Sequence, residues 1–194
     1  MPYHHGNLRE VLIQKAAEVI EEDGIGALSL RAVARRAHVS HGAPAHHFTD
    51  KAGLLTALAT HGMERLSAAL FEADRVAGDS PLARLRAIAT AYVRFAAQNP
   101  AYFRIVTRFE LIRPYDAAFA EAYQGTFDLV RDAVCAAQQE GWRAETDPMA
   151  LVVTFWSAMH GLATLWLDGT LKDRVGPVDL EAMTTQVVRV VTTG

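Results

Sequence analysis

The chain has 194 residues, of which 51% are hydrophobic and 21% charged, and its formal net charge is −3. This length and apolar content suit one large domain or two small ones with a proper core, and they exclude a disordered chain, which would combine few apolar residues with a high net charge. Cys135 is the only cysteine, which excludes an internal disulfide and is typical of a reducing compartment, so a cytoplasmic protein is expected.

The charge is distributed unevenly along the chain. Residues 1–65 hold seven Lys or Arg and seven Asp or Glu, so the excess of acid lies entirely in residues 66–194. Residues 24–49 contain no acid at all. The basic residues of that acid-free stretch are Arg31, Arg35, Arg36, His38, His41, His46 and His47. This stretch therefore predicts a basic surface in the first third of the chain.

Two helices are predicted before residue 38. Apolar residues at helical spacing from Leu8 to Ile20 predict a first helix, and Gly24 would end it. Ser29 is a natural N-cap for a second, short helix that runs to about Ala37.

Two more helices are predicted directly after a break at residues 38–40. Ser40 is expected to cap a third short helix that runs to about His47, because Pro44 is tolerated in a first turn. Asp50 is expected to cap a fourth helix that starts at Lys51.

The remaining helices follow Pro and Gly signals. They are expected from residue 81, from residue 100, from beyond Pro114 to Gly141, from 148 to about 168, and over 178–191. No run of alternating apolar residues predicts a strand. The predicted fold class is therefore all-α, with about nine helices.

Two short helices joined by a three-residue turn on a basic, acid-free surface are typical of a helix-turn-helix, whose second short helix lies in the major groove of DNA. Gly42 and Ala43 would let the backbone approach the bases closely, and Lys51 would contact a phosphate. The alternative is a solvated basic face on an ordinary all-α protein.

Three stretches resemble the N-terminal domain of TetR-family transcriptional regulators. They are YHHGNLR at 3–9, LSLRAVARRAHVS at 28–40 and HFTDKAGLL at 47–55. The resemblance implies a three-helix helix-turn-helix DNA-binding domain over 6–66, followed by a larger helical ligand-binding and dimerisation domain over 67–194. It also implies a homodimer that reads double-stranded, palindromic operator DNA.

The same resemblance implies which residues contact DNA. His38 replaces the usual turn glycine, and histidine tolerates the left-handed backbone that this turn requires. Ala45 replaces a tyrosine that tends to contact the DNA backbone, and His46 stands where a basic residue is frequent. The expected DNA-binding residues are His5, Arg31, Ser40, His41, Gly42, Ala43, His46, His47 and Lys51.

Residues 149–167 carry no charge in nineteen positions, a length that could span a membrane. A helix that is apolar all round can equally be buried in its own domain and against a partner, and this second interpretation is favoured, so no membrane partner is expected. Trp156, His160 and Gly161 resemble the Trp-His-Gly signature of a C-terminal domain of the family. By the family's pattern, helices 148–168 and 178–191 of each subunit form a four-helix dimer interface.

A ligand pocket, if present, would lie inside the C-terminal helices, although aromatic residues at helical spacing more often form a core. The candidate lining residues are Tyr92, Phe95, Phe103, Val106, Phe109, Phe127, Trp156, Met159 and His160. A small, largely apolar effector of unknown identity is expected, and repression relieved by that effector is the family's commonest behaviour.

Other classes of function have weaker support. The sequence has no Gly-rich phosphate loop, no GxSxG and no HExxH, so no enzyme and no cofactor are expected. His38 with His41, or His46 with His47, could bind zinc, but the cysteines and acids that usually complete such sites are missing, so no metal is expected. A helical ligand carrier or membrane-associated module that does not bind DNA remains as an alternative.

Overall fold

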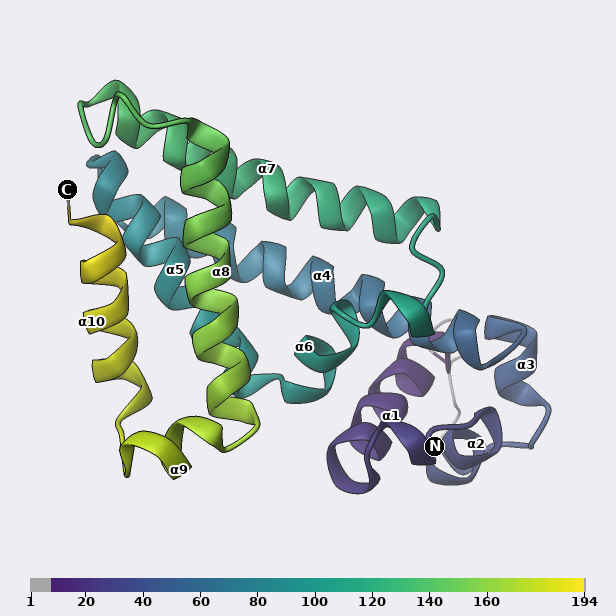
Figure 1. Cartoon of the computed structure of the whole chain (residues 1–194). Coiled ribbons are helices and arrows are strands. Elements are labelled where there is room, and N and C mark those ends of the chain that lie inside the picture. Colours follow the sequence, from purple (N-terminus) through teal and green to yellow (C-terminus); the bar gives the residue numbers. More distant parts are fainter. Residues whose placement is uncertain (1–7, 194) are drawn as a thin grey trace. The chain divides into compact units, whose positions relative to one another are not determined.

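A computed structural model describes residues 8–193, and every regular element in this range is a helix (Figure 1). The α-helices are α1 (Leu8–Asp23), α2 (Leu30–Arg36), α3 (Ala43–Phe48), α4 (Lys51–Val76), α5 (Pro81–Gln98), α6 (Pro100–Val106), α7 (Ala117–Gln139), α8 (Pro148–Leu167), α9 (Thr170–Val175) and α10 (Leu180–Thr192). Two 3-10 helices, η1 (Ile25–Ala27) and η2 (Phe109–Leu111), join them. The all-α prediction is confirmed.

Most helix ends lie where capping chemistry predicts them. The Ser29 hydroxyl accepts from the Ala32 amide at 3.1 Å, and the Asp147 carboxylate accepts from the Ala150 amide at 2.8 Å. Gly24 ends α1 with a positive φ of 81°, a conformation that costs glycine little. These side chains satisfy amides that have no partner inside the helix.

Two expectations about helix ends and number are wrong. α3 begins at Ala43 rather than at Ser40, and its N-cap Gly42 offers no side chain, because Pro44 fits only the first turn of a helix. α9 was not predicted at all. Its six residues lie between Gly169 and Gly176, both at positive φ, and a helix of this length is too short to show a periodic apolar pattern.

The packing forms two compact units. One contains residues up to Met63 together with Pro100–Ala122, and the other contains Glu64–Asn99 and the chain from Tyr123 onward. α4 and α7 each contribute turns to both units. This division concerns packing alone, and the functional boundary between residues 66 and 67 stays a prediction.

The first unit packs α1, α2, α3 and α6 around the first half of α4. Leu12, Val33 and Leu54 are fully buried, and Phe48 closes the core from α3. Gly62 lets α6 approach α4 closely, because a Cβ at that position would lie 3.2 Å from the Tyr102 Cβ. The core of this unit therefore depends on side chains that lie about forty residues beyond the helix-turn-helix.

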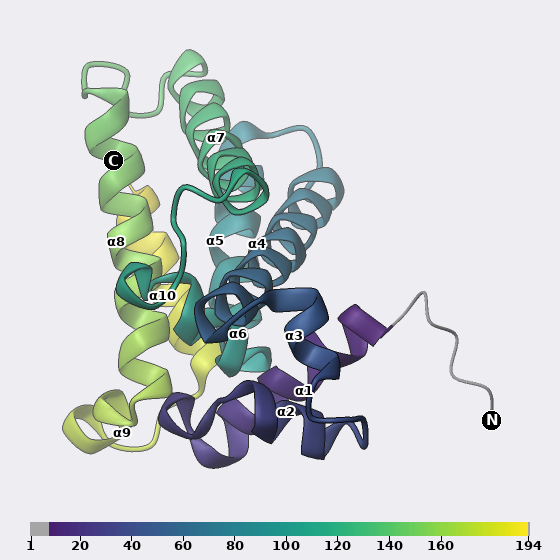
Figure 2. The ribbon, with the colours of Figure 1, turned by 90° about the vertical axis from the view of Figure 1, so that its right-hand side faces the viewer.

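The second unit packs α5, α8 and α10 side by side (Figures 1 and 2). Ile88 of α5, Val152 and Met159 of α8, and Val188 of α10 are buried between them. The Trp142 indole nitrogen donates to the Thr192 carbonyl oxygen at 2.9 Å, which ties the end of α10 to the segment after α7.

A polar link crosses the interior of this second unit. The Tyr92 hydroxyl lies 2.9 Å from Nδ1 of His160, so α5 and α8 share a hydrogen bond. Burial raises the pKa of Tyr92, and a hydrogen bond from the Trp156 side chain opposes that rise. Burial also lowers the pKa of His160, so the imidazole is favoured in its neutral form.

We expect Gly53→Ala to destabilise the protein by about 1–3 kcal/mol, because the added Cβ would overlap the Phe48 carbonyl oxygen, which is backbone and cannot swing aside. Gly125→Ala is the matched control. It lies inside α7 with open space around its Cα, so it should stabilise by about 0.5–1 kcal/mol. Urea unfolding of both variants measures this, and equal effects would contradict the expected clash.

We also expect the free energy of unfolding to fall as the pH drops below about 6.5, because the unfolded state takes up the His160 proton before the folded state does. The contribution should be complete above about pH 7.5 and should diminish toward the lowered pKa of the folded state. Urea unfolding from pH 5 to 8 at one protein concentration measures it. His160→Gln should have a shallower dependence on pH, and an unchanged dependence would assign the effect to other groups.

Candidate nucleic-acid interface

The turn between α2 and α3 has the geometry of a helix-turn-helix. His38 adopts a φ of 55°, which confirms the left-handed conformation predicted for this position. The Val39 amide donates to the Ala34 carbonyl at 3.0 Å and closes the end of α2. The chain is thus turned from α2 into α3 by a single residue in a strained conformation.

α3 has one buried face and one exposed face. Pro44 and Phe48 point into the core, and the guanidinium carbon of Arg9 lies 5.7 Å from the centre of the Phe48 ring. Ala45, His46 and His47 are exposed. Because residues four apart share a helix face, anchoring Pro44 and Phe48 presents the intervening side chains to solvent.

The predicted DNA-binding residues form an exposed surface on this unit. Seven of them are exposed, namely Arg31, Ser40, His41, Gly42, His46, His47 and Lys51, and Ala43 is partly buried. His5 lies outside the described residues. The Lys51 ammonium donates to the Ile25 carbonyl at 3.5 Å, a weak contact that leaves it accessible at the start of α4. Contact of these side chains with DNA stays a prediction.

Arg36 differs from the other arginines of the acid-free stretch. Its guanidinium pairs with Glu22 and lies 3.3 Å from Glu18, both on α1, and it also approaches Asp23 at 4.0 Å. The hydrogen bond to Glu22 is the largest cause that raises the pKa of Arg36. The acid run that ends α1 therefore neutralises this arginine, while Arg31 and Arg35 stay exposed.

Asp50 is the first acid after the basic stretch, and its carboxylate has two roles. One oxygen accepts from the Gly53 amide at 2.8 Å and caps α4, as predicted, and the other accepts from the Arg113 guanidinium at 2.8 Å. The Arg113 amide in turn donates to the Thr56 hydroxyl at 2.9 Å. Arg113 was missed in the sequence, because a partner 63 residues away leaves no local signal.

The predicted pocket residues are divided between the two compact units. Phe103, Val106 and Phe109 belong to the first unit, where Phe109 packs edge-to-face on Phe119 at 6.0 Å. The remaining six lie in the second unit, namely Tyr92, Phe95, Phe127, Trp156, Met159 and His160. Of these, Tyr92, Trp156 and His160 are brought together. A ligand-binding role for any of the nine stays a prediction.

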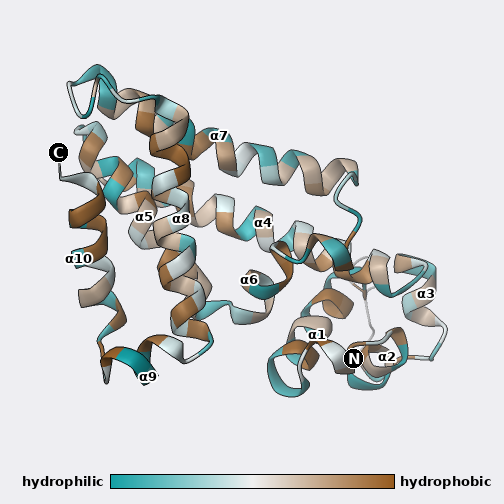
Figure 3. Ribbon diagram, viewed as in Figure 1, coloured by the Kyte–Doolittle hydropathy of each residue, from teal (hydrophilic) through white to brown (hydrophobic). Residues whose placement is uncertain are grey.

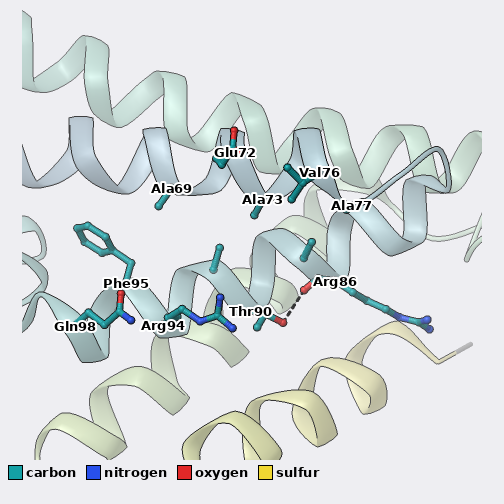
Figure 4. Close-up of a pocket in the computed structure, with 12 residues that line it drawn as sticks. Ala69, Glu72, Ala73, Val76, Ala77, Arg86, Thr90, Arg94, Phe95 and Gln98 are labelled. Carbon is teal, nitrogen blue, oxygen red and sulfur yellow. Dashed lines mark hydrogen bonds between the residues drawn. The ribbon is translucent and has the colours of Figure 1, made fainter.

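A groove of about 510 Å³ runs between the second half of α4 and α5 (Figure 4). Phe95 is its only lining residue among the nine predicted ones. Most of the lining is alanine, which aromatic patterning cannot find. Among residues 8–193, no three metal-ligating side chains lie together.

α8 is long and apolar enough to cross a membrane by length and composition alone, and only 33% of its apolar window is buried in the single chain. Its brown residues stand out in Figure 3 against the hydrophilic α9. The unburied residues share one face, which includes Val153, Ser157 and Gly161.

Comparison with known families gives two matches. The family described as "Tetracyclin repressor-like, C-terminal domain" matches residues 85–191, which is more than half of the chain. The family described as "Bacterial regulatory proteins, tetR family" matches residues 12–58. The second match contains α2, the turn and α3.

Similar individual proteins agree with this. The HTH-type transcriptional regulator BetI of Burkholderia thailandensis is 41% identical over 83 residues, and the match spans 43% of this chain and 43% of BetI, less than half of either. A protein of unknown function from Rhodococcus sp. RHA1 is 35% identical over the whole of both chains, with a TM-score of 0.82. FadR from Bacillus subtilis, solved with stearoyl-CoA, has a TM-score of 0.78 at 18% identity, covering 95% of this chain and 98% of FadR, and shares the fold.

Family membership decides between the regulator and the carrier that does not bind DNA. The helix-turn-helix of the first unit is the part that both the tetR-family match and the BetI match contain. The chain therefore belongs to the TetR family, and it is a DNA-binding transcriptional regulator rather than an enzyme.

Proposed function

We propose that this protein is a cytoplasmic, homodimeric repressor that binds a palindromic operator through α3 and leaves it when a small, largely apolar effector binds residues 67–194. The observation that carries the proposal is the exposed, acid-free surface of α2, the turn and α3. A dimer places two such surfaces on one DNA face, and adjacent major grooves are about 34–36 Å apart.

The charges around α3 support an electrostatic attraction to phosphate. His41, His46 and His47 are exposed on or beside α3, and Arg31 and Lys51 lie at the starts of the helices on either side. Asp50 is the nearest acid, and its charge is balanced by Arg113 at 2.8 Å. Phosphate contacts supply most of the sequence-independent affinity, and base contacts from α3 supply specificity.

The first test is selection of genomic DNA fragments by the purified protein at fixed physiological salt. A shared palindromic motif with two half-sites is expected. No enrichment by folded, dimeric protein, either alone or with added cell metabolites, would overturn the proposal. The metabolites cover the case in which a co-repressor is required.

On the selected operator, Lys51→Gln should weaken binding and reduce the slope of log K against log salt by about one, because one phosphate contact is lost. Lys172→Gln on α9 removes the same charge from an exposed position in the other unit and should leave the slope unchanged. Fluorescence anisotropy at several salt concentrations measures both. Equal slopes for the two variants would remove Lys51 from the interface.

The second unit carries a surface suited to dimerisation. Val153 and Trp156 of α8 are 47% and 38% exposed, and Val190 of α10 is 71% exposed. Open space surrounds the Gly161 Cα, so a second helix can approach α8 closely there. An exposed apolar face without charges would be costly in a monomer, and pairing α8 and α10 with their copies would bury it.

We expect Val153→Lys to convert the dimer into a folded monomer, because the ammonium would be buried without a partner. Phe71→Lys is the matched control. It adds the same charge at a side chain that is 54% exposed on α4, outside the proposed interface, and it should leave the dimer intact. Sedimentation velocity gives the mass and circular dichroism confirms folding. A dimeric, folded Val153→Lys variant would place the interface elsewhere.

Effector release would act through the spacing of the two α3 helices. A ligand that binds one conformation of the dimer more tightly shifts the population toward it, and a change of spacing breaks the match to successive major grooves. The solved FadR complex with stearoyl-CoA shows that the fold can hold an apolar chain in another protein. This supports an apolar effector and names no effector for this chain.

A further inference from the structure

The groove between α4 and α5 exists because small side chains face each other across it. Five alanines line it, namely Ala69, Ala73 and Ala77 from α4 and Ala87 and Ala91 from α5. Neither helix has a long apolar side chain to fill the space, although protein interiors usually close such gaps. The groove volume of about 510 Å³ is within the range of small-molecule sites.

The groove is long and apolar. Its lining on α5 extends from Arg86 to Gln98, a distance of about 18 Å at the helical rise per residue. Phe95 lies toward one end and Arg86 toward the other, with the alanines between them (Figure 4). This shape fits one extended hydrocarbon chain better than a compact ring system.

The charged residues of the groove leave one positive charge uncompensated. Glu72 is bound by both nitrogens of Arg75, at 2.6 and 2.8 Å, and the hydrogen bond to Arg75 lowers the pKa of Glu72, so this pair is neutral overall. Arg94 lies 3.5 Å from Glu181. Only Arg86 has no acidic partner, within the part of the chain that the structure describes.

Arg86 is held in place but keeps donors to spare. Its Nε donates to the Thr192 hydroxyl at 2.8 Å, which orients the guanidinium toward α10 at the rim of the groove. Its two terminal nitrogens remain for a planar anion such as a carboxylate. A neutral apolar molecule would leave this charge unpaired, and a small polar anion would leave the alanines uncovered.

We propose that the α4–α5 groove binds an amphiphile with one extended hydrocarbon chain and an anionic head, with the head at Arg86 and the chain along the alanines toward Phe95. Only the identification of this ligand as the effector rests on the proposed function. The binding itself does not require DNA.

Isothermal titration calorimetry on DNA-free protein tests the proposal with laurate, below its micelle concentration, and with dodecanol, which has the same chain and a neutral head. Laurate should bind once per chain and about tenfold more tightly than dodecanol, because a charge-assisted hydrogen bond is lost with the alcohol. Lauroyl-coenzyme A is the third probe. Binding stronger than that of laurate identifies a thioester as the source of the chain, and weaker binding identifies the free acid.

Three variants locate the site. Arg86→Gln keeps a donor for Thr192 and should weaken laurate about tenfold while leaving dodecanol unchanged. Ala91→Leu fills the groove and should weaken both ligands. Arg174→Gln removes an exposed arginine of α9 and should change neither.

Equal affinities for laurate and dodecanol, or full binding by the Ala91→Leu variant, would overturn the proposal. Anisotropy on the selected operator is measured separately with the same ligand. Laurate that binds in the groove without releasing DNA supports the site and contradicts its role as the effector site. Release of DNA by laurate from the Ala91→Leu variant as from the unchanged protein contradicts the site and supports an effector that binds elsewhere.

Discussion

The carboxylate of Asp50 fixes the junction between α3 and α4, and the DNA-binding surface depends on this junction. One oxygen caps α4 through the Gly53 amide, and the other holds Arg113. Gly53 is required beside it, because any Cβ there would overlap the Phe48 carbonyl. Phe48 in turn anchors α3 in the core, so the position of the exposed histidines follows from a tight backbone contact and one shared carboxylate.

The same carboxylate links the helix-turn-helix to a segment far along the chain. Arg113 belongs to the stretch 100–122, which packs in the first unit together with α6. Its side chain also balances the one acid that borders the basic surface, and its amide bonds to Thr56. The electrostatic character of the DNA-binding surface is therefore maintained partly by a residue outside the 6–66 segment.

The second unit uses its helices on two faces. α8 turns Val152 and Met159 toward α5 and α10, and the Tyr92–His160 hydrogen bond sets the register of α5 and α8. The opposite face of α8 is apolar and unburied in the single chain, which suits association with a second copy. α5 likewise packs on α8 with one face and borders the alanine-lined groove with another. Dimerisation and ligand binding are thus assigned to different faces of the same helices.

The sequence by itself determined the helical elements, most of their caps, the exposed basic surface and the family, because capping and helical periodicity are local and the tetR-type motifs are contiguous. It also anticipated the left-handed turn at His38. Only the tertiary structure decided that Arg36 pairs with α1, that Arg113 reaches Asp50, and that Phe103 and Val106 lie in the core of the first unit. These depend on side chains brought together from distant positions, and a groove made by alanines is a space between helices, which no pattern along one helix encodes.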